Sequence, residues 1–381
     1  MVATKVRRIR GTLPACALLI CALVFAGGAL ELLTRLAFHS SGRQIENYRP
    51  RLSRTGRTGD LAFDLRRFIS HPFLPYLSRP FDSRTLYVFR RDIKQVVSYE
   101  YLNNSLGFRS PERPFVKQAR TKRILTLGGS TTWDGPTNDL TWPTLLERKL
   151  QAEYSQTSYT IEVMNLGVDA GTSPMSFTIL SFLGTEFSPD LVISYDGVND
   201  NAFIGYQGIT PDYRSAIRHF DDQKRPLAAR LPAWTMWSYV VSLGARGLDR
   251  LLGFGFMDVW DAAYTVRKLP HGPDEMAGIE YFQRNLRLMR GVAKEYGAGF
   301  LGATAHWVSP SSIQRRQNDA MRRFFADSGI EFVDLDSLLP HQDWSIHVDQ
   351  VHWTPKGLDL VAESFKRAIC SRDMLGLEQR R

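Results

Sequence analysis

Short apolar runs alternate with segments of helical spacing from residue 121 to the end of the chain. The predicted helices have apolar residues every three or four positions, whereas the predicted strands are short apolar runs. The strands are predicted at 123–127, 159–166, 190–195, 300–304 and 330–333, and the helices at 142–154, 173–187, 274–296, 311–327 and 355–369. Strands alternating with helices of this length predict an α/β fold, with a central parallel sheet covered by helices on both faces.

The segments before and inside this alternation have a different character. Residues 61–120 contain two strand-like pieces and then a turn at Asn103–Asn104, which predicts an N-terminal extension packed on the main domain. Residues 201–273 interrupt the alternation with an aromatic-rich insertion, interpreted either as a lid or as a partner surface. The main domain is therefore predicted over 121–381, with this insertion inside it.

The first 38 residues have the pattern of a membrane anchor. Four Lys or Arg residues lie within the first ten positions, before an uncharged run at 11–30. About 20 apolar residues are enough to cross the hydrocarbon core as a helix. Positive charge before the run predicts a cytoplasmic N-terminus and an exported remainder. A cleaved signal peptide is the alternative, because residues 24–26 suit a signal peptidase. A basic linker is predicted over 39–60.

Charge and cysteine content restrict the partners of the exported part. The 381 residues are 43% hydrophobic and carry a net charge of +9, but residues 1–60 alone hold ten Lys or Arg against three acidic residues. The rest of the chain is close to neutral, which argues against a nucleic-acid partner. Cys16 and Cys21 lie in the apolar run, so Cys370 is the single thiol of the exported part and no internal disulfide is predicted.

Candidate chemistry follows the first strand, since ligands of an open parallel sheet bind beyond the carboxyl ends of its strands. The strand runs into Gly128, Gly129 and Ser130, which presents its hydroxyl at the start of a helix. The segment lacks the lysine of a phosphate-binding loop, the spacing of a dinucleotide fingerprint and the second glycine of a GxSxG elbow. A helix-capping serine is the alternative.

The later strands end in loops that also carry candidate residues. The second runs into 165–173, where small residues let the backbone approach a ligand closely. The third runs into 196–200, where the amide of Asn199 can donate a hydrogen bond to a developing oxyanion without carrying charge. His306 follows the fourth strand and is interpreted as a pocket or structural residue.

A candidate base lies just before the last predicted helix, which Pro355 can help to start. Asp349 and His352 are three positions apart, so the carboxylate can hold one imidazole nitrogen while the other faces the edge of the sheet. This arrangement supplies a base for Ser130. A metal site of His347, Asp349 and His352 is one alternative, and a surface Asp–His pair is the other.

Taken in order, these segments resemble the four blocks of the SGNH (GDSL-type) hydrolases, over residues 123–368. The segment 103–112 is also similar to the approach to this domain in membrane-anchored bacterial members. The resemblance implies a flavodoxin-like three-layer sandwich with Ser130 as the nucleophile. Gly129 stands where many members have Asp, a departure that leaves the role of the hydroxyl intact.

The resemblance also assigns the remaining site residues. Asp349 and His352 complete a catalytic triad, and the oxyanion is bound by the N–H groups of Ser130 and Ala170 and by the amide of Asn199. Family members have Gly where this chain has Ala170. A backbone donor survives that change, and Gly171 is the equivalent position if the register is shifted by one.

The implied protein is an exported, membrane-anchored serine esterase, periplasmic or on the cell surface, that needs no cofactor and no metal. Its partners are a small ester or an acylated glycan, with O-acetyl groups on glycans as the leading substrate, and the membrane through its N-terminal helix. Trp133 and Trp353 are expected to form aromatic walls for an acyl chain or a sugar. The alternatives are an O-acyltransferase to an envelope or extracellular polysaccharide that uses the same serine, and an inactive envelope scaffold.

Overall fold

The computed structural model of the chain divides into two units. One comprises Met1–Arg51 and Arg225–Phe256, and the other comprises Leu52–Lys224 and Met257–Arg381. The structure describes residues 21–37, 57–58, 68–69, 71–90, 95–204, 209–213, 238, 240–241, 244 and 275–377. Most of the predicted linker at 39–60 and of the predicted insertion at 201–273 lies outside these described residues.

The smaller unit contains a helix at 21–37. Within this unit the Glu31 carboxylate accepts hydrogen bonds from the Ser238 hydroxyl at 2.9 Å and from the Val240 N–H at 3.1 Å. In the part of the chain that the structure describes, no helix combines the length and the apolar content needed to cross a membrane. Residues 11–20, the first half of the predicted span, lie outside that part.

The larger unit is built on a five-stranded parallel sheet. Its strands are β6 (Thr121–Gly128), β7 (Thr160–Asn165), β8 (Leu191–Tyr195), β9 (Gly299–Ala303) and β10 (Glu331–Val333). They lie side by side in the order β10-β9-β8-β6-β7, and every neighbouring pair is parallel. Numbered along the chain and read from β7, this is the order 2-1-3-4-5 of flavodoxin. The predicted α/β fold with a parallel sheet is confirmed.

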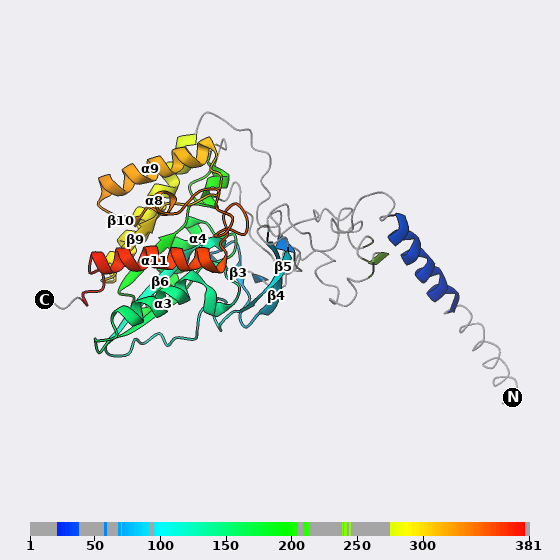
Figure 1. Cartoon of the computed structure of the whole chain (residues 1–381), viewed down its shortest axis with the longest axis horizontal. Helices are drawn as coiled ribbons and strands as arrows, with labels where there is room; N and C mark the ends of the chain where they lie inside the picture. Colours follow the sequence, from blue (N-terminus) through cyan, green and yellow to red (C-terminus); the bar gives the residue numbers. More distant parts are fainter. Residues whose placement is uncertain are drawn as a thin grey trace. The chain divides into compact units, whose positions relative to one another are not determined.

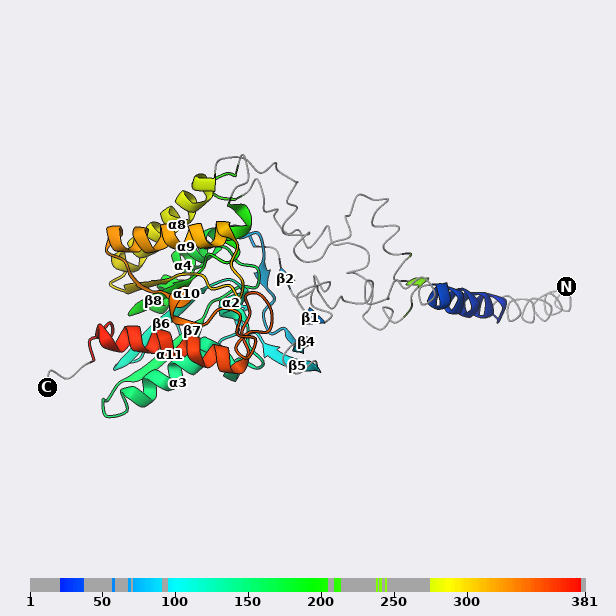
Figure 2. The same ribbon diagram turned by 45° about the horizontal axis from the view of Figure 1, so that its top comes forward.

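Helices cover both faces of this sheet (Figure 2). The helices α3 (Trp142–Glu153) and α11 (Pro355–Ser371) pack together on one face, and α4 (Ser173–Phe182), α8 (Glu275–Glu295) and α9 (Ser312–Ser328) lie on the other. Under α3 and α11, the rings of Trp142 and Phe365 stack at 4.7 Å, and Tyr195 of β8 meets both edge-on. This aromatic cluster fixes the two helices against the middle of the sheet.

The helix predicted at 173–187 is shorter than expected. The helix α4 ends at Phe182, because Leu183 leaves the helical conformation at φ −134° and ψ −47°, and the 3-10 turn η4 (Gly184–Phe187) follows. Gly184 packs closely on the sheet at this point, since an added Cβ there would lie 3.2 Å from a methyl carbon of Leu125. Tertiary packing therefore ends the helix before its apolar periodicity does.

The N-terminal extension, together with β1 from the end of the predicted linker, forms two small antiparallel sheets beside the main one (Figure 1). One pairs β2 (Phe68–Ile69) with β3 (Leu77–Ser78), and the other pairs β1 (Arg57–Thr58) with β4 (Ser83–Arg90) and β4 with β5 (Gln95–Leu102). The extension contacts the main sheet's loops directly. For example, the Tyr76 hydroxyl donates to the carbonyl of Asp169 at 2.9 Å.

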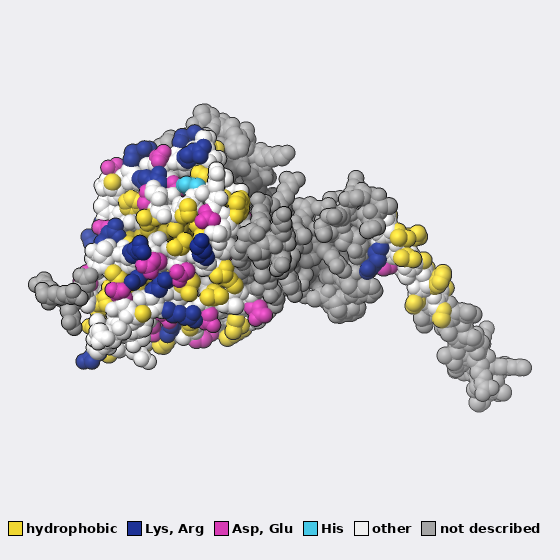
Figure 3. Space-filling model, viewed as in Figure 1, with side chains coloured by type: hydrophobic (Ala, Val, Ile, Leu, Met, Phe, Trp, Pro, Cys, Tyr) yellow, Lys and Arg dark blue, Asp and Glu magenta, His cyan; other side chains and the backbone are white. Residues whose placement is uncertain are grey.

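Charges of both signs are mixed on the surface of the larger unit. Figure 3 shows Lys and Arg side chains interspersed with Asp and Glu over α3 and α11. Several of them pair across these two helices, with Lys149 Nζ 2.9 Å from Asp359 Oδ1 and Lys366 Nζ 2.7 Å from Glu153 Oε2. On this face, the near-neutral net charge of the chain after residue 60 thus takes the form of local pairs of opposite charge.

Candidate active site

Ser130 lies where the strand order of the sheet reverses. The strands β6 and β8 are neighbours, but the chain continues from β6 to α3 on one face and from β8 toward α8 on the other. In open parallel sheets, ligands bind in the crevice that this divergence leaves at the carboxyl ends of the strands. Ser130 follows β6, and Asn199 follows β8. The topology therefore brings two of the predicted site residues to the same edge of the sheet, at the point where the strand order reverses.

The backbone around Ser130 is shaped by two glycines. Gly128 has a φ of +153°, and an added Cβ there would lie 2.5 Å from the carbonyl oxygen of Tyr195. Ser130 begins the one-turn helix α2 (Ser130–Trp133), whose N-cap is Gly129 and has no side-chain cap bond. The helix-capping interpretation of Ser130 is therefore wrong. Its side chain is directed to His352 instead.

Ser130, His352 and Asp349 form a continuous chain of hydrogen bonds. Nε2 of His352 lies 2.8 Å from Oγ of Ser130, and Nδ1 lies 2.7 Å from Oδ2 of Asp349. A carboxylate only accepts, so Nδ1 carries the proton and Nε2 is left to accept the serine hydroxyl proton. Ser130 and Asp349 are each 2% exposed. The alternative of a surface Asp–His pair is therefore wrong, because Asp349 and His352, which is 7% exposed, are both buried.

The loop before α11 holds Asp349 in a fixed orientation. Oδ1 of Asp349 accepts the backbone N–H groups of Val351 at 3.0 Å and of His352 at 2.9 Å. The loop is closed by a hydrogen bond from the Val348 N–H to the His352 carbonyl at 2.8 Å. Three donors thus meet one carboxylate, which fixes the orientation of Asp349 and, through it, of the imidazole.

Asn199 is packed against the turn that carries Ser130. Its Nδ2 donates to the carbonyl of Gly171 at 2.7 Å, and an added Cβ at Gly129 would overlap this same nitrogen. The loop at 165–173 lies on the other side of the turn, since the Val168 N–H donates to the Gly128 carbonyl at 3.0 Å. The three segments predicted to surround the serine are therefore in contact.

The geometry of the loop at 165–173 bears on whether Ala170 or Gly171 is the predicted backbone donor to the oxyanion. The Gly171 N–H donates to the Val168 carbonyl at 2.8 Å, so this amide is already engaged within its own loop. Ala170 has a φ of +58°, in the left-handed region that favours glycine. The left-handed backbone thus lies at Ala170, the position given by the unshifted register.

A pair of buried carboxyl groups supports these loops, and the sequence analysis did not single them out. Asp200 accepts hydrogen bonds from the Ser173 N–H, the Gly197 N–H and the Tyr213 hydroxyl, and Asp196 accepts from the Ser176 and Ser194 hydroxyls. Burial, followed by the proximity of Asp200, raises the pKa of Asp196 to about 7. Burial also raises the pKa of Asp200. The sequence feature that could have identified this pair is the presence of two acidic residues, one on either side of Asn199, within five positions.

Trp133 and Trp353 do not form the predicted aromatic walls. Each is only 1% exposed, so neither ring presents a face to a substrate. The Trp133 ring packs edge-on against Tyr101 at 5.1 Å, and the Trp353 ring packs on His347 at 4.3 Å. Trp133 lies three residues after Ser130, and Trp353 directly follows His352. This proximity in the chain suggested contact with a substrate, which the burial of both rings excludes.

The alternative metal site of His347, Asp349 and His352 is not assembled. Both ring nitrogens of His352 are engaged, by Asp349 and by Ser130. His347 instead stacks on His306, with parallel rings 5.0 Å apart. The three residues therefore do not converge on one point, and His306 is a packed interior residue that is 0% exposed.

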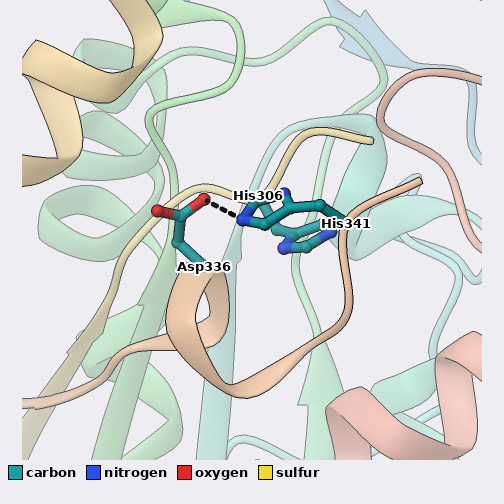
Figure 4. A group of neighbouring side chains, drawn as sticks. All are labelled: His306, Asp336 and His341. Carbon is teal, nitrogen blue, oxygen red and sulfur yellow. Dashed lines mark ion pairs between the residues drawn. The ribbon is translucent and has the colours of Figure 1, made fainter. Parts of the chain in front are cut away.

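A second group of candidate metal ligands lies nearby. His306, Asp336 and His341 place potential ligand atoms within 4.8 Å of one another (Figure 4). However, the rings of His306 and His341 are stacked 4.8 Å apart with planes only 10° from parallel. A metal ion is bound along the lone pair in the plane of each imidazole, and two parallel planes share no such point. As arranged, this cluster is a stack of rings and does not form a ligand set.

No protein-family model and no curated protein matches the sequence. Solved structures resemble the larger part of the chain. One assigned to the G-D-S-L lipolytic family, from Desulfitobacterium hafniense, is 13% identical, with 65% of this chain and 99% of that chain covered and a TM-score of 0.40. An acetylxylan esterase from Geobacillus stearothermophilus is 14% identical over 65% and 94%, also with a TM-score of 0.40.

A lipase/acylhydrolase from Enterococcus faecalis is similar to the same extent. It is 14% identical, with 66% of this chain and 96% of that chain covered and a TM-score of 0.40. These neighbours are lipolytic proteins and esterases, but identities and TM-scores this low do not transfer an activity. The function is therefore inferred from the geometry of the site.

Proposed function

We propose that this chain is a serine ester hydrolase with Ser130 as nucleophile, His352 as general base and acid, and Asp349 as the residue that orients the imidazole. The observation that carries the proposal is the pair of short contacts at His352, 2.8 Å to Ser130 Oγ and 2.7 Å to Asp349 Oδ2. A serine hydroxyl is a weak nucleophile at neutral pH and needs an adjacent base in hydrogen-bond reach.

The reaction would proceed by two acyl transfers. Ser130 Oγ attacks the ester carbonyl carbon while its proton passes to Nε2 of His352. The carbon–oxygen bond to the leaving alcohol then breaks, and His352 returns the proton to that alcohol. In the second step a water molecule, deprotonated by His352, attacks the acyl-enzyme and releases the carboxylic acid and free Ser130.

We assign the oxyanion contacts to the N–H groups of Ser130 and Ala170 and to Nδ2 of Asn199. The packing of Asn199 against Gly129 supports this assignment, because it puts the amide beside the turn that carries the nucleophile. Removing one such donor in enzymes costs about 3 to 4 kcal/mol of barrier. Asn199→Ala should accordingly lower kcat about a hundredfold to a thousandfold.

Hydrolysis of a small chromogenic acetate tests the proposal. With the purified full chain, Ser130→Ala and His352→Ala should be no faster than the blank, whereas Ser155→Ala, on an exposed turn, should match the parent. Labelling of Ser130 by a fluorophosphonate probe should be lost in the same two variants. Turnover at the parent rate in either variant contradicts the proposal, and a parent that neither turns over nor labels favours the inactive scaffold.

For the substrate we propose O-acetyl groups on glycans, acted on outside the cytoplasm by a protein anchored through its N-terminal segment. The basic start and apolar run of the leader support export, and the reaction requires only an acyl ester. Acetylated polysaccharide with and without an added sugar acceptor separates hydrolysis from transfer. Free acetate as the product supports the hydrolase, and an acetylated acceptor would make the chain an O-acyltransferase.

A further inference from the structure

The segment 103–112 contacts the helix that carries Ser130. Arg109 of this segment is 1% exposed, and its Nη1 donates to the carbonyls of Trp133 and Gly135, both at 3.1 Å. Its Nε donates to Oδ1 of Asn138 at 3.0 Å. The guanidinium also lies over the Trp133 ring, 4.8 Å from the ring centre. Arg109 therefore binds the carboxyl-terminal end of α2 through hydrogen bonds to backbone carbonyls and through a cation–π contact with the Trp133 ring.

The conformation of the rest of the segment positions the side chain of Arg109. Oδ1 of Asn104 accepts the N–H groups of Leu106 at 3.0 Å and Phe108 at 2.9 Å, which closes a tight turn. Gly107 has a φ of +88°, and an added Cβ there would overlap the carbonyl of Ser78. Phe108 is fully buried. The turn, the glycine and the buried ring together direct Arg109 inward.

The helix α2 needs external support because it is a single turn. Its internal hydrogen bonds include the Trp133 N–H to the Gly129 carbonyl at 3.0 Å and the Asp134 N–H to the Ser130 carbonyl at 2.8 Å. The carbonyls at its end are held from outside, with Nδ2 of Asn165 donating to Thr132 at 3.0 Å and Arg109 donating to Trp133. A cationic donor at a helix carboxyl terminus satisfies carbonyls that have no partner within the helix.

We propose that Arg109 is a positioning residue for the nucleophile, which holds the end of α2 and thereby keeps Ser130 Oγ in reach of His352 Nε2. This inference rests on the proposed function for its effect on catalysis. A lysine at position 109 would keep the charge but lose the planar fork that reaches Trp133, Gly135 and Asn138 together. A misplacement of about 1 Å at a catalytic group can cost a hundredfold in rate.

The first test compares Arg109→Lys with Arg113→Lys in the full chain. Arg113 lies one residue beyond this segment, and its guanidinium pairs with Glu147 of α3 at 2.9 Å and with Glu162 of β7 at 3.6 Å. For Arg109→Lys we expect kcat on a chromogenic acetate to fall about tenfold to a hundredfold with KM within twofold of the parent. Arg113→Lys should change kcat by less than twofold. An unchanged kcat in Arg109→Lys overturns the proposal.

The second test does not depend on activity. Hydrogen exchange of the amides at 129–135 should be faster in Arg109→Lys than in the parent and in Arg113→Lys, with little change in the strands of the sheet. An unchanged rate at 129–135, or an equal acceleration throughout the chain, overturns the positioning role. A parent that lacks esterase activity would defeat the proposed function, while the exchange result would still decide whether Arg109 holds α2.

If Arg109→Lys does not fold, Asn138→Ala provides the same measurement. Asn138 accepts from Arg109 Nε and lies in the short turn η3 (Asn138–Leu140), none of whose residues is buried. The substitution removes this anchor of the guanidinium and leaves the others, and it also removes the two hydrogen bonds between the Asn138 side chain and the backbone of Leu102. A fall in kcat at constant KM, together with faster exchange at 129–135, supports the proposal. Parent values for both measurements contradict it.

Discussion

Gly129 has no side chain, and this leaves room for the side-chain amide of Asn199. An added Cβ at position 129 would overlap Nδ2 of Asn199 and would lie 2.8 Å from the carbonyl oxygen of Gly171. Distances this short force one of the neighbours to move. A side chain at position 129 would therefore displace the amide of Asn199, which occupies this space.

The consequence can be measured with Gly129→Ala. We expect kcat for acetate hydrolysis to fall about tenfold or more, because Asn199 is displaced from the turn of Ser130. Gly291→Ala in α8 is the matched control, since an added Cβ at Gly291 meets no atom within 4 Å. That variant should keep the parent kcat. Equal activity of the two variants would show that Asn199 tolerates the displacement or has no part in the reaction.

Ala170 carries backbone strain that a glycine would relieve. Its φ of +58° is a left-handed conformation that costs a residue with a Cβ about 1 to 2 kcal/mol. Ala170→Gly should raise the free energy of unfolding by about 1 kcal/mol or less, after the greater flexibility of glycine in the unfolded chain is subtracted. Urea unfolding measures the change. A loss of stability would mean that the Ala170 methyl contributes more by packing than the strain costs.

At the scale of elements, Asp200 joins the start of α4 to the loop after β8. It accepts from the backbone N–H groups of Ser173 at 3.2 Å and Gly197 at 3.3 Å, and from the Tyr213 hydroxyl at 2.9 Å. Asn285 of α8 completes the junction by donating to the Ser173 hydroxyl at 2.9 Å. This junction connects the loop of Ala170 to the loop of Asn199.

Asp200→Asn should weaken both the fold and the site. An amide offers one acceptor oxygen where the carboxyl group offers two, so at least one buried N–H or O–H donor loses its partner, at a cost of about 1 to 3 kcal/mol. We expect a lower urea midpoint and a lower kcat, because the two loops lose their common anchor. Asp327→Asn on an exposed position of α9 should change neither value. If Asp200→Asn is destabilised but keeps the parent kcat, the junction supports the fold and has no part in the activity of the site.

For the molecule as a whole, two buried histidines are expected to lower the stability of the folded state in acid. Burial, followed by the nearby His341, lowers the pKa of His306 to about 4, and burial with the nearby His306 lowers the pKa of His347 to about 3. An unfolded histidine has a pKa near 6.5. As pH falls below 6.5 the unfolded state therefore takes up protons that the folded state does not, and the free energy of unfolding decreases.

Comparison with His306→Gln isolates this effect. Between pH 6.5 and 4, His306 alone should account for about 3 kcal/mol of the stability lost by the parent, and the variant should lack that part of the slope. The Asp196 carboxyl group acts in the opposite direction, since its raised pKa gives stability that is lost as pH rises from about 4 toward 7, but both proteins contain it. Urea unfolding at pH 6.5 and pH 4 gives the comparison, and parallel losses would refute the assignment.

Much of the fold could be read from local patterns. The strand predicted at 123–127 is the middle of β6, and the helices predicted at 142–154 and 355–369 match α3 and α11 to within two residues, because apolar periodicity reports which face of an element is buried. The two-residue strands β2 and β3 were missed, since so short a segment has no period. The end of α4 was missed because contact with β6 decided it.

The amino-acid sequence by itself determined which reactive groups the protein has and that each follows a strand or precedes the last helix. That information was enough to select Ser130, Asp349 and His352 as a group, because side-chain chemistry and local spacing are properties of the chain. Only the tertiary structure decided their separations, the engagement of Gly171, the burial of Trp133 and Trp353, and the contact of Arg109 with α2. These features depend on neighbours that are remote in the chain, and no local pattern records which remote residues fill the space beside a side chain.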